Sequence, residues 1–287
     1  MTSLTYKQFY NLDETGIAIK YYTEHGYYTP PHWHSALELI FVLNGTAQMT
    51  IDGRVHSLIP GEFVLIDSNQ IHESRCAAMT MGLCIHISRQ HLLKYLPDLD
   101  RLNLCFSREL LEKKELSTYL EICELLKRLP PLYIQQPPGY RLECESVAMH
   151  ILYLAANHLA RPVSRPQMPE YAGSLDRLER ITSYVEQHYA EPISLETMAG
   201  ELGLSREYFC RFFKQHMGVT FSHYVNQIRL IHIHYDLCRS HDGIMEIAER
   251  HGFTNYKLFN RMFKEIYGCT PRSLRRDGGA ALDETLS

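Results

Sequence analysis

The sequence predicts an α+β protein with two domains, a β-barrel in the N-terminal half and an all-α domain in the C-terminal half. Three observations support this prediction. Short apolar runs separated by turn dipeptides fill residues 1–90, and the apolar period becomes helical from residue 89 onwards. A proline-rich stretch at residues 161–173 then separates the two halves. A length of 287 residues also suits two domains.

Composition narrows the class of protein. Hydrophobic residues make up 45% of the chain and charged residues 22%, which is typical of folded globular proteins. The net charge of −4, from 29 Lys and Arg against 33 Asp and Glu, argues against a polybasic binder but allows local basic patches. No apolar run reaches the ~18 residues of a transmembrane helix, and residues 1–10 lack a signal-peptide pattern. We therefore expect a cytoplasmic protein with no membrane partner, whose eight cysteines are reduced.

The N-terminal strands follow from apolar runs and turn signals. Residues 37–43, 47–51 and 63–66 are apolar runs of strand length. Asn44-Gly45 predicts a hairpin between the first two runs, and Asp52-Gly53 is a second tight-turn dipeptide. Short strands at this spacing predict a small barrel or sandwich.

Two helices are predicted after the strands. The first covers residues 110–129 and is expected to end at Pro130-Pro131, and the second covers residues 140–160. The second has one apolar stripe, formed by Ala148, Ile151, Leu152, Ala155 and Leu159. This stripe either packs on the chain's own barrel or forms the seam of a dimer.

The proline-rich stretch divides the chain into domains. We predict a ligand-sensing and dimerisation domain at 1–160, an extended linker at 161–173, a helical domain at 174–277 and a tail at 278–287. Pro162, Pro166 and Pro169 disfavour helix within the linker.

The helical domain contains an internal repeat. Residues 193–203 resemble residues 243–252 at an offset of 49, and later matches at an offset of 50 include Phe209/Phe259, Arg211/Arg261, Phe213/Phe263 and Lys214/Lys264. Each copy has a short helix ended by glycine, then a turn, then a second helix with one apolar and one polar face. These are the parts of a helix-turn-helix unit. A single helix of about 27 Å is expected between the copies, which would place the two recognition helices near the ~34 Å of one DNA turn.

This half resembles the DNA-binding domain of AraC/XylS-type transcription regulators over residues 175–276. The strongest match is Ile247-Ala-Glu-Arg-His-Gly-Phe253, followed by Phe259-Asn-Arg-Met-Phe-Lys264, Gly268-Cys-Thr-Pro271 and Arg275. The resemblance implies double-stranded DNA and RNA polymerase as partners.

The resemblance also implies roles for individual residues. The base-contacting positions are Glu207, Cys210, Arg211, Lys257, Asn260 and Arg261. The phosphate-contacting positions are Arg206, Lys214, Gln215, Asn255, Tyr256 and Lys264. Arginine suits guanine because it contacts O6 and N7 together, whereas phosphate contacts position the protein without specifying sequence. A merely solvated surface is the alternative for each of these side chains.

A histidine pattern lies in the predicted barrel. Gly26-x5-His32-x-His34-x3-Glu38-x6-Gly45 matches the first cupin motif at every spacing. The second motif is partial, because Gly61 and His72 are in place but Asp67, Asn69 and Cys76 stand where Pro, Gly and Asn are expected. This resemblance covers about residues 15–90.

The cupin resemblance leaves three roles open for His32, His34, Glu38 and His72. In metal-binding cupins these positions are the ligands, and three imidazoles with a carboxylate suit Zn, Fe, Mn or Ni. Purely structural hydrogen bonding is the second role. The third is an organic-effector pocket that also includes Trp33. We favour the third role because the second motif is degraded, so no cofactor is favoured and a divalent transition metal is the alternative.

Together these features predict a ligand-responsive, sequence-specific DNA-binding transcription regulator. We expect an activator and not an enzyme, acting as a homodimer through residues 1–160, with a carbohydrate-linked signal as the leading small-molecule effector. The alternative is a cupin metalloenzyme, or a metal-dependent sensor, with an accessory helical domain. The partial second motif and the repeated helix-turn-helix units count against it. A non-DNA-binding adaptor is a third reading, disfavoured by Arg211 and Arg261.

Overall fold

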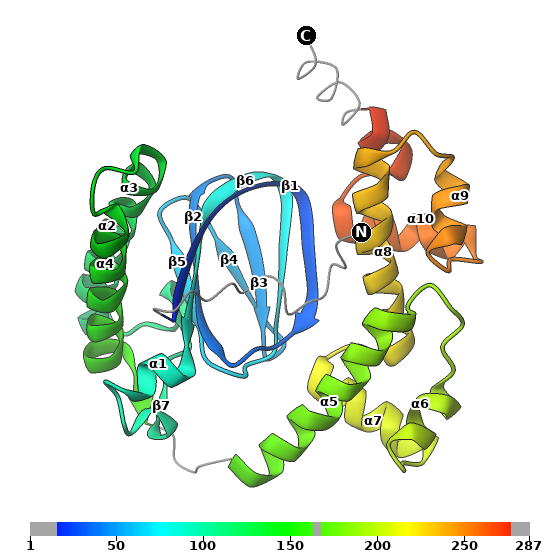
Figure 1. Cartoon of the computed structure of the whole chain (residues 1–287), viewed down its shortest axis with the longest axis horizontal. Coiled ribbons are helices and arrows are strands. Elements are labelled where there is room, and N and C mark those ends of the chain that lie inside the picture. The colour runs from blue at the N-terminus through cyan, green and yellow to red at the C-terminus, as the bar shows by residue number, and fades with distance from the viewer. Residues whose placement is uncertain (1–15, 163–167, 277–287) are drawn as a thin grey trace. The chain divides into compact units, whose positions relative to one another are not determined.

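The computed structural model describes residues 16–162 and 168–276 (Figure 1). The chain divides into two compact units, with the main boundary between Met168 and Pro169. Residues 163–167 of the predicted linker and the predicted tail lie outside the described residues.

The N-terminal unit is built on a seven-stranded sheet. Its strands are β1 (Ile17–His32), β2 (Ala36–Asn44), β3 (Ala47–Ile51), β4 (Arg54–Leu58), β5 (Phe63–Ile66), β6 (His72–Ser88) and β8 (Phe106–Ser107). The order is β4-β3-β6-β2-β5-β8, and β1 also pairs with β6. A separate two-stranded sheet joins β7 (Leu102–Asn103) to β9 (Arg161–Pro162). The prediction of a β-rich N-terminal half is confirmed.

The prediction of a hairpin at Asn44-Gly45 is wrong. The order of strands places β6 between β2 and β3, so these two strands do not pair. Gly45 instead passes close to β6, because a Cβ at this position would collide with the carbonyl oxygen of Met79. The hairpin lies one turn later, where Asp52-Gly53 connects β3 to β4 with Ile51 opposite Arg54. Both turn residues have positive φ, as a tight hairpin turn requires.

A layer of helices covers one face of the sheet (Figure 1). It follows α1 (Arg89–Leu93) and consists of α2 (Leu116–Lys127), α3 (Leu129–Gln135) and α4 (Tyr140–Leu154), the last continued by a π-helical turn at Ala155–Leu159. The predicted helix at 110–129 is shorter than expected, since α2 begins at Leu116. Pro130 and Pro131 do not end the helical region but lie in the first turn of α3. Prolines are tolerated there because the first N–H groups of a helix have no intrahelical partner.

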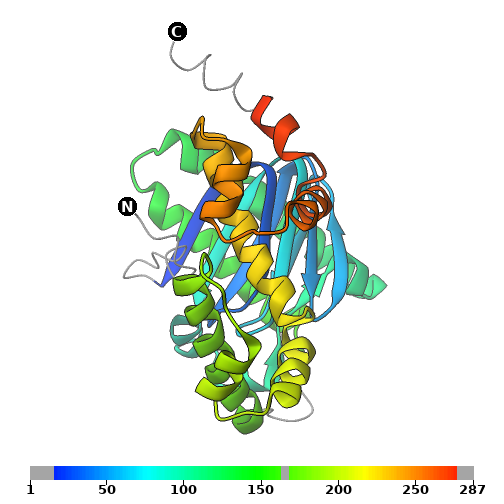
Figure 2. The same ribbon diagram turned by 90° about the vertical axis from the view of Figure 1, so that its right-hand side faces the viewer.

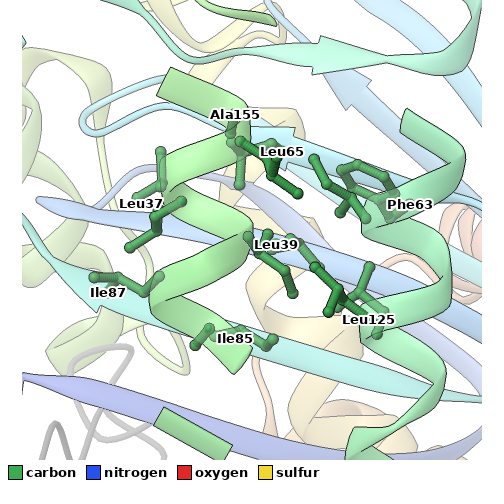
Figure 3. Packing of buried hydrophobic residues seen from close by; sticks show 14 of the residues in the cluster. Leu37, Leu39, Phe63, Leu65, Ile85, Ile87, Leu125 and Ala155 are labelled. Carbon is green, nitrogen blue, oxygen red and sulfur yellow. The ribbon is translucent and has the colours of Figure 1, made fainter. Parts of the chain in front are cut away.

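The core of this unit lies between the sheet and the helices. Alternation along β2 turns Leu37, Leu39 and Phe41 towards the helices, where they pack with residues of β5, β6, α2 and α4 (Figure 3). The apolar stripe of residues 140–160 belongs to the same core, and its five residues are at most 4% exposed. The stripe therefore packs on its own sheet, which is the first of the two alternatives, and the chain itself already covers it.

Between residues 168 and 276 all the regular elements of the C-terminal unit are helices. It contains α5 (Met168–His188), α6 (Leu195–Glu201), α7 (Arg206–Met217), α8 (Phe221–Arg239), α9 (Ile244–Arg250) and α10 (Tyr256–Tyr267). Helix α8 connects the pair α6–α7 to the pair α9–α10 (Figure 2). The structure differs from the predicted extended linker at residues 168–173, where α5 has already begun. Pro169 is accommodated because it is the second residue of this helix.

Local signals set the boundaries of these helices. Ser194, Ser205 and Asn255 each accept a backbone N–H bond as N-caps of α6, α7 and α10. Gly203 and Gly252 follow α6 and α9 with φ of +64° and +81°, a conformation that favours glycine. Among the described helices, none combines the length and hydropathy needed to cross a bilayer.

Candidate functional site

The first recognition surface lies on α7. Glu207, Cys210, Arg211 and Lys214 are exposed, and their spacing of three and four residues places them on one helix face. The opposite face buries Phe209, Phe212 and Phe213. Because the apolar face is fixed in the core, the polar face is presented to solvent in one orientation.

The second recognition surface repeats this pattern on α10. Lys257, Arg261 and Lys264 are exposed and Asn260 is half-buried on the same face. Arg261 is 3.9 Å from Glu265 at the closest approach of their charged groups. Asn260 donates from Nδ2 to the carbonyl of Tyr256 at 3.0 Å, so one of its two amide hydrogens is already used.

The remaining predicted phosphate-contacting residues are of two kinds. Some have exposed side chains, and others already contact another residue of the chain. Gln215 and Tyr256 are exposed at the two surfaces. Arg206, the first residue of α7, pairs with Glu196 of α6 at 2.9 Å. Asn255 accepts from Leu258 N at 3.0 Å as the cap of α10, so its side chain already has a structural role.

A second candidate site surrounds Glu38 on the sheet face that points away from the helices. Glu38 Oε2 lies 2.9 Å from His34 Nε2 and 2.9 Å from His72 Nε2. Its other oxygen, Oε1, lies 3.4 Å from His86 Nε2 and accepts from Cys84 Sγ at 3.1 Å. We call these five residues the Glu38 cluster. The side chains of Glu38 and its three histidines are only 1–9% exposed, so the cluster is closed to bulk water.

Sequence reasoning found three members of this cluster and missed Cys84 and His86. The pairing of β2 with β6 places His86 directly opposite Glu38 and Cys84 opposite Ile40. A signal was present, because Cys84 and His86 alternate with apolar residues that face the core. The neighbouring strand could not be inferred, however, since β6 is far from β2 in sequence. Trp33 is half-buried between β1 and β2.

The histidine rings are oriented by backbone carbonyls. The Nδ1 atoms of His32, His34 and His72 lie 2.8–2.9 Å from the carbonyl oxygens of residues 30, 36 and 70. A carbonyl can only accept, so each Nδ1 carries its proton and each Nε2 is left to face another partner. His32, His34, Glu38 and His72 each offer a ligand atom within 4.8 Å of one another, and so do Glu38, Cys84 and His86.

Electrostatics keeps Glu38 ionised. Burial raises its pKa, but the imidazole of His86 and the close contacts of His34 and His72 outweigh burial, so the pKa is well below the usual value. Burial also lowers the pKa of His34. The Cys84 thiol has a pKa well above the usual value because it is buried beside Glu38. The cluster therefore offers a carboxylate and imidazoles, a donor set that fits a divalent transition metal.

Comparison with known proteins identifies both domains. Residues 21–86 match the family described as Cupin domain, and residues 198–277 match the family described as Helix-turn-helix domain. A relative from Escherichia fergusonii, called HTH-type transcriptional activator RhaS, is 26% identical over 98% of this chain and 100% of its own length. An uncharacterized HTH-type transcriptional regulator from Staphylococcus aureus is 23% identical over 88% of this chain. The chain spans about a third of that relative's length, 33%.

Solved structures that are similar to this chain superpose on it with low TM-scores. One is fatty-acid-bound ToxT from Vibrio cholerae, which is 15% identical over 90% of this chain and 94% of its own, with a TM-score of 0.43. Another is a protein of unknown function from Listeria innocua, which is 29% identical over 34% of this chain and 94% of its own, with a TM-score of 0.33.

The fold and the paired recognition surfaces define a two-domain helix-turn-helix protein. The chain combines an N-terminal cupin domain with a C-terminal AraC-type helix-turn-helix domain, as its motifs implied.

Proposed function

We propose that this chain is a sequence-specific DNA-binding transcription regulator whose cupin domain senses a small molecule. The observation that carries the proposal is the repetition of one exposed polar face on α7 and α10, each backed by a buried aromatic face. A helical bundle without a partner has no need for two matched basic surfaces. The relative named a transcriptional activator supports activation as the mode of regulation.

The two surfaces are related but not identical, which has a consequence for the DNA site. Arg211 and Arg261 occupy the same place on the two helices and suit guanine. Glu207 on α7 can accept from a cytosine amino group, whereas Lys257 at the matching place on α10 donates. One chain therefore reads two different subsites, and its DNA site is not a palindrome within one chain.

The proposal is tested by selecting duplexes from a random library with the full chain and titrating variants against the selected and random DNA. Arg211→Ala should lose about 1–3 kcal/mol on the selected site and relax preference at one base. Lys214→Ala should weaken both DNAs alike and reduce the salt slope by about one. Arg239→Ala is the matched control, because Arg239 is exposed on α8 and contacts Tyr235. Identical behaviour of Arg211→Ala and Lys214→Ala would contradict these roles.

Other parts of the proposal rest on the domain pair alone. They are a homodimer formed through residues 1–160, contact with RNA polymerase, a cytoplasmic location and the absence of enzymatic activity. The apolar stripe of α4 is unavailable for the dimer, so dimerisation must use another surface of the N-terminal unit.

A divalent metal is a second candidate ligand for the cupin domain, favoured by the geometry of the Glu38 cluster. With its proton on Nδ1, a neutral His34 or His72 presents a lone pair to a carboxylate that has only lone pairs. Two such contacts at 2.9 Å become favourable when either a proton or a metal ion lies between the nitrogen and the oxygen. Protonating both rings would bury two positive charges, whereas one metal ion bound by His32, His34, Glu38 and His72 would satisfy all of them and cross-link β1, β2 and β6.

An organic effector bound directly to Glu38, which the sequence favoured, would have to displace the contacts that close the cluster. Elemental analysis and thermal unfolding with and without a chelator separate these cases. A metal site predicts about one ion per chain and stabilisation of roughly 3 kcal/mol at a hundredfold excess over Kd. His72→Ala should abolish both effects and His56→Ala should not, because His56 is buried on β4 beside Ser107. Metal-free protein that is insensitive to chelator would contradict the metal and leave the effector.

A further inference from the structure

We propose that a junction centred on Tyr189 fixes the orientation of the two helix-turn-helix units, so that the chain binds its two DNA subsites at one spacing only. The junction consists of Tyr189, Arg229, His232, Asp236, His251 and Gly252. Its consequence for DNA rests on the proposed function, whereas its mechanical role does not.

Three rings from three parts of the helical unit stack together. Tyr189 lies between α5 and α6, and its ring stacks on His232 of α8 with centroids 4.0 Å apart and planes within 2°. The ring of His251, at the end of α9, lies 5.8 Å from both of the others. The segment that leads into the first helix-turn-helix unit (α6–α7) therefore contacts both the connecting helix α8 and the second helix-turn-helix unit (α9–α10).

A chain of hydrogen bonds runs through the same rings. His251 Nε2 lies 2.8 Å from Asp236 Oδ2, and since a carboxylate only accepts, Nε2 carries the proton. His251 Nδ1 is then an acceptor, and the Tyr189 hydroxyl donates to it at 3.3 Å. His251 is 8% exposed, so these bonds are shielded from water.

The backbone is fastened at the same place. Arg229 of α8 donates from Nε to the carbonyl of Tyr189 at 2.6 Å and from a terminal nitrogen to the carbonyl of Glu191 at 2.8 Å. Gly252 begins the turn of the second unit, and a Cβ there would lie 2.6 Å from the carbonyl oxygen of Ala190. The turn of the second unit is thus pressed directly against the segment entering the first.

The matching positions of the first helix-turn-helix unit differ from the junction in residue type and in packing. Leu202 stands where the repeat has His251, and Gly203 stands where it has Gly252. A Cβ on Gly203 would meet nothing within 4 Å. The helix-turn-helix turn therefore needs glycine for its positive φ in both units, but the close approach is an added feature of the second unit only.

The mechanical consequence follows from the number of attachments. Helix α8 alone would join the two units through one rod, and long helices bend. The junction adds a second attachment beside this rod, so relative rotation of α7 and α10 must break the ring stack or the Arg229 bonds. Tyr189 is therefore a positioning residue. It does not contact DNA, but it holds the DNA-facing surfaces of α7 and α10 at a fixed separation.

Spin-label distances test the mechanical role without DNA. In the full chain, labels at Cys210, an exposed native cysteine, and at Asn260→Cys report the separation of α7 and α10, with Cys210→Ser as the background for the other cysteines. We expect one narrow distance distribution, broadened about twofold or more by Tyr189→Ala as α8 is freed to bend. Tyr184→Ala is the matched control, because Tyr184 stacks on His188 of the same helix and so does not link two helices through this contact. Equal widths in all variants would overturn the proposal.

Three further variants guard against simple misfolding. Tyr189→Phe keeps the ring stack and loses only the hydroxyl bond, so its distribution should stay close to that of the parent. Gly252→Ala should broaden the distribution and Gly203→Ala should not, although both substitutions pay the cost of positive φ. Broadening by Gly203→Ala to the same extent would show that strain in either turn, and not the junction, controls the distance.

Binding to altered DNA tests the consequence for spacing. The probe is a duplex selected by the parent chain, with one or two base pairs inserted between its subsites. The parent should lose about tenfold or more in affinity on insertion, equivalent to losing about one good base contact, and Tyr189→Ala should lose less than about threefold. An equal loss in both proteins would overturn the inference. Failure of the parent to select any duplex would overturn the proposed function, while the spin-label distances would still decide the mechanical role.

Discussion

Protonation of His232 in the unfolded chain should penalise the folded helical unit as the pH falls, and His232→Phe should remove this contribution. Burial lowers the pKa of His232 from 6.5 to about 4, and the neighbouring His251 lowers it further while Asp236 opposes the shift. The folded chain therefore keeps the ring neutral at pH values where the unfolded chain protonates it. The stability contributed by the neutral ring is complete above pH ~6.5 and is lost as the pH falls towards the folded pKa.

The magnitude follows from the size of the shift. A lowering from 6.5 to about 4 corresponds to at most about 3 kcal/mol when fully expressed, at about 1.36 kcal/mol per pKa unit. Between pH 7 and pH 5 the same linkage amounts to about 2 kcal/mol. Since His232 is only partly buried, we expect about 1–2 kcal/mol. Phenylalanine keeps a flat ring for the stack on Tyr189 and removes the titrating group.

The assay is urea unfolding of the full chain at pH 7 and pH 5, followed by circular dichroism at the helix band. Trp33 is the one tryptophan of the sequence and lies in the N-terminal unit, so its fluorescence supplies an internal control whose pH dependence should not change. His188→Phe is the matched variant, because His188 also stacks on a tyrosine but at the exposed end of α5. The test is the difference between the two proteins: if the change in unfolding free energy from pH 7 to pH 5 is the same in His232→Phe and in the parent, the reasoning is wrong.

Three further predictions concern single side chains. Burial raises the pKa of Glu186 to about 7, so the folded state is penalised as the pH rises from ~4.5 through 7, and Glu186→Gln should raise the melting temperature at pH 8 but not at pH 4. Asn255→Ala should cost about 1 kcal/mol in urea unfolding because it removes the cap of α10; no change would mean that this cap is dispensable. Ala148→Leu should cost about 1–3 kcal/mol without altering the oligomeric state in sedimentation, because Ala148 is buried against its own sheet.

The helical half could be predicted from the sequence because its determinants are local. Ser194, Ser205 and Asn255 cap helices within three residues of themselves, and the apolar period of α7 and α10 repeats at a fixed offset. The sheet order could not be predicted in this way. Asn44-Gly45 has the composition of a hairpin turn, but β6 pairs with both flanking strands and separates them. Pairing across dozens of residues outweighed the local preference of a dipeptide.

The same division between local and distant information explains what was missed at the sites. The cupin motif places His34 and Glu38 four residues apart, so their contact is nearly fixed by the sequence, whereas His86 joins them only through strand register. The repeat likewise revealed two equivalent units but hid the junction, because the junction exists only where the copies differ. Leu202 and His251 occupy matching places, and only the histidine can bond both Tyr189 and Asp236. In a duplicated domain, matching positions report the shared fold and DNA-facing surface. The mismatched positions, including Glu207 against Lys257, are therefore where one copy acquired what the other lacks, and where substitutions should separate the two units in function.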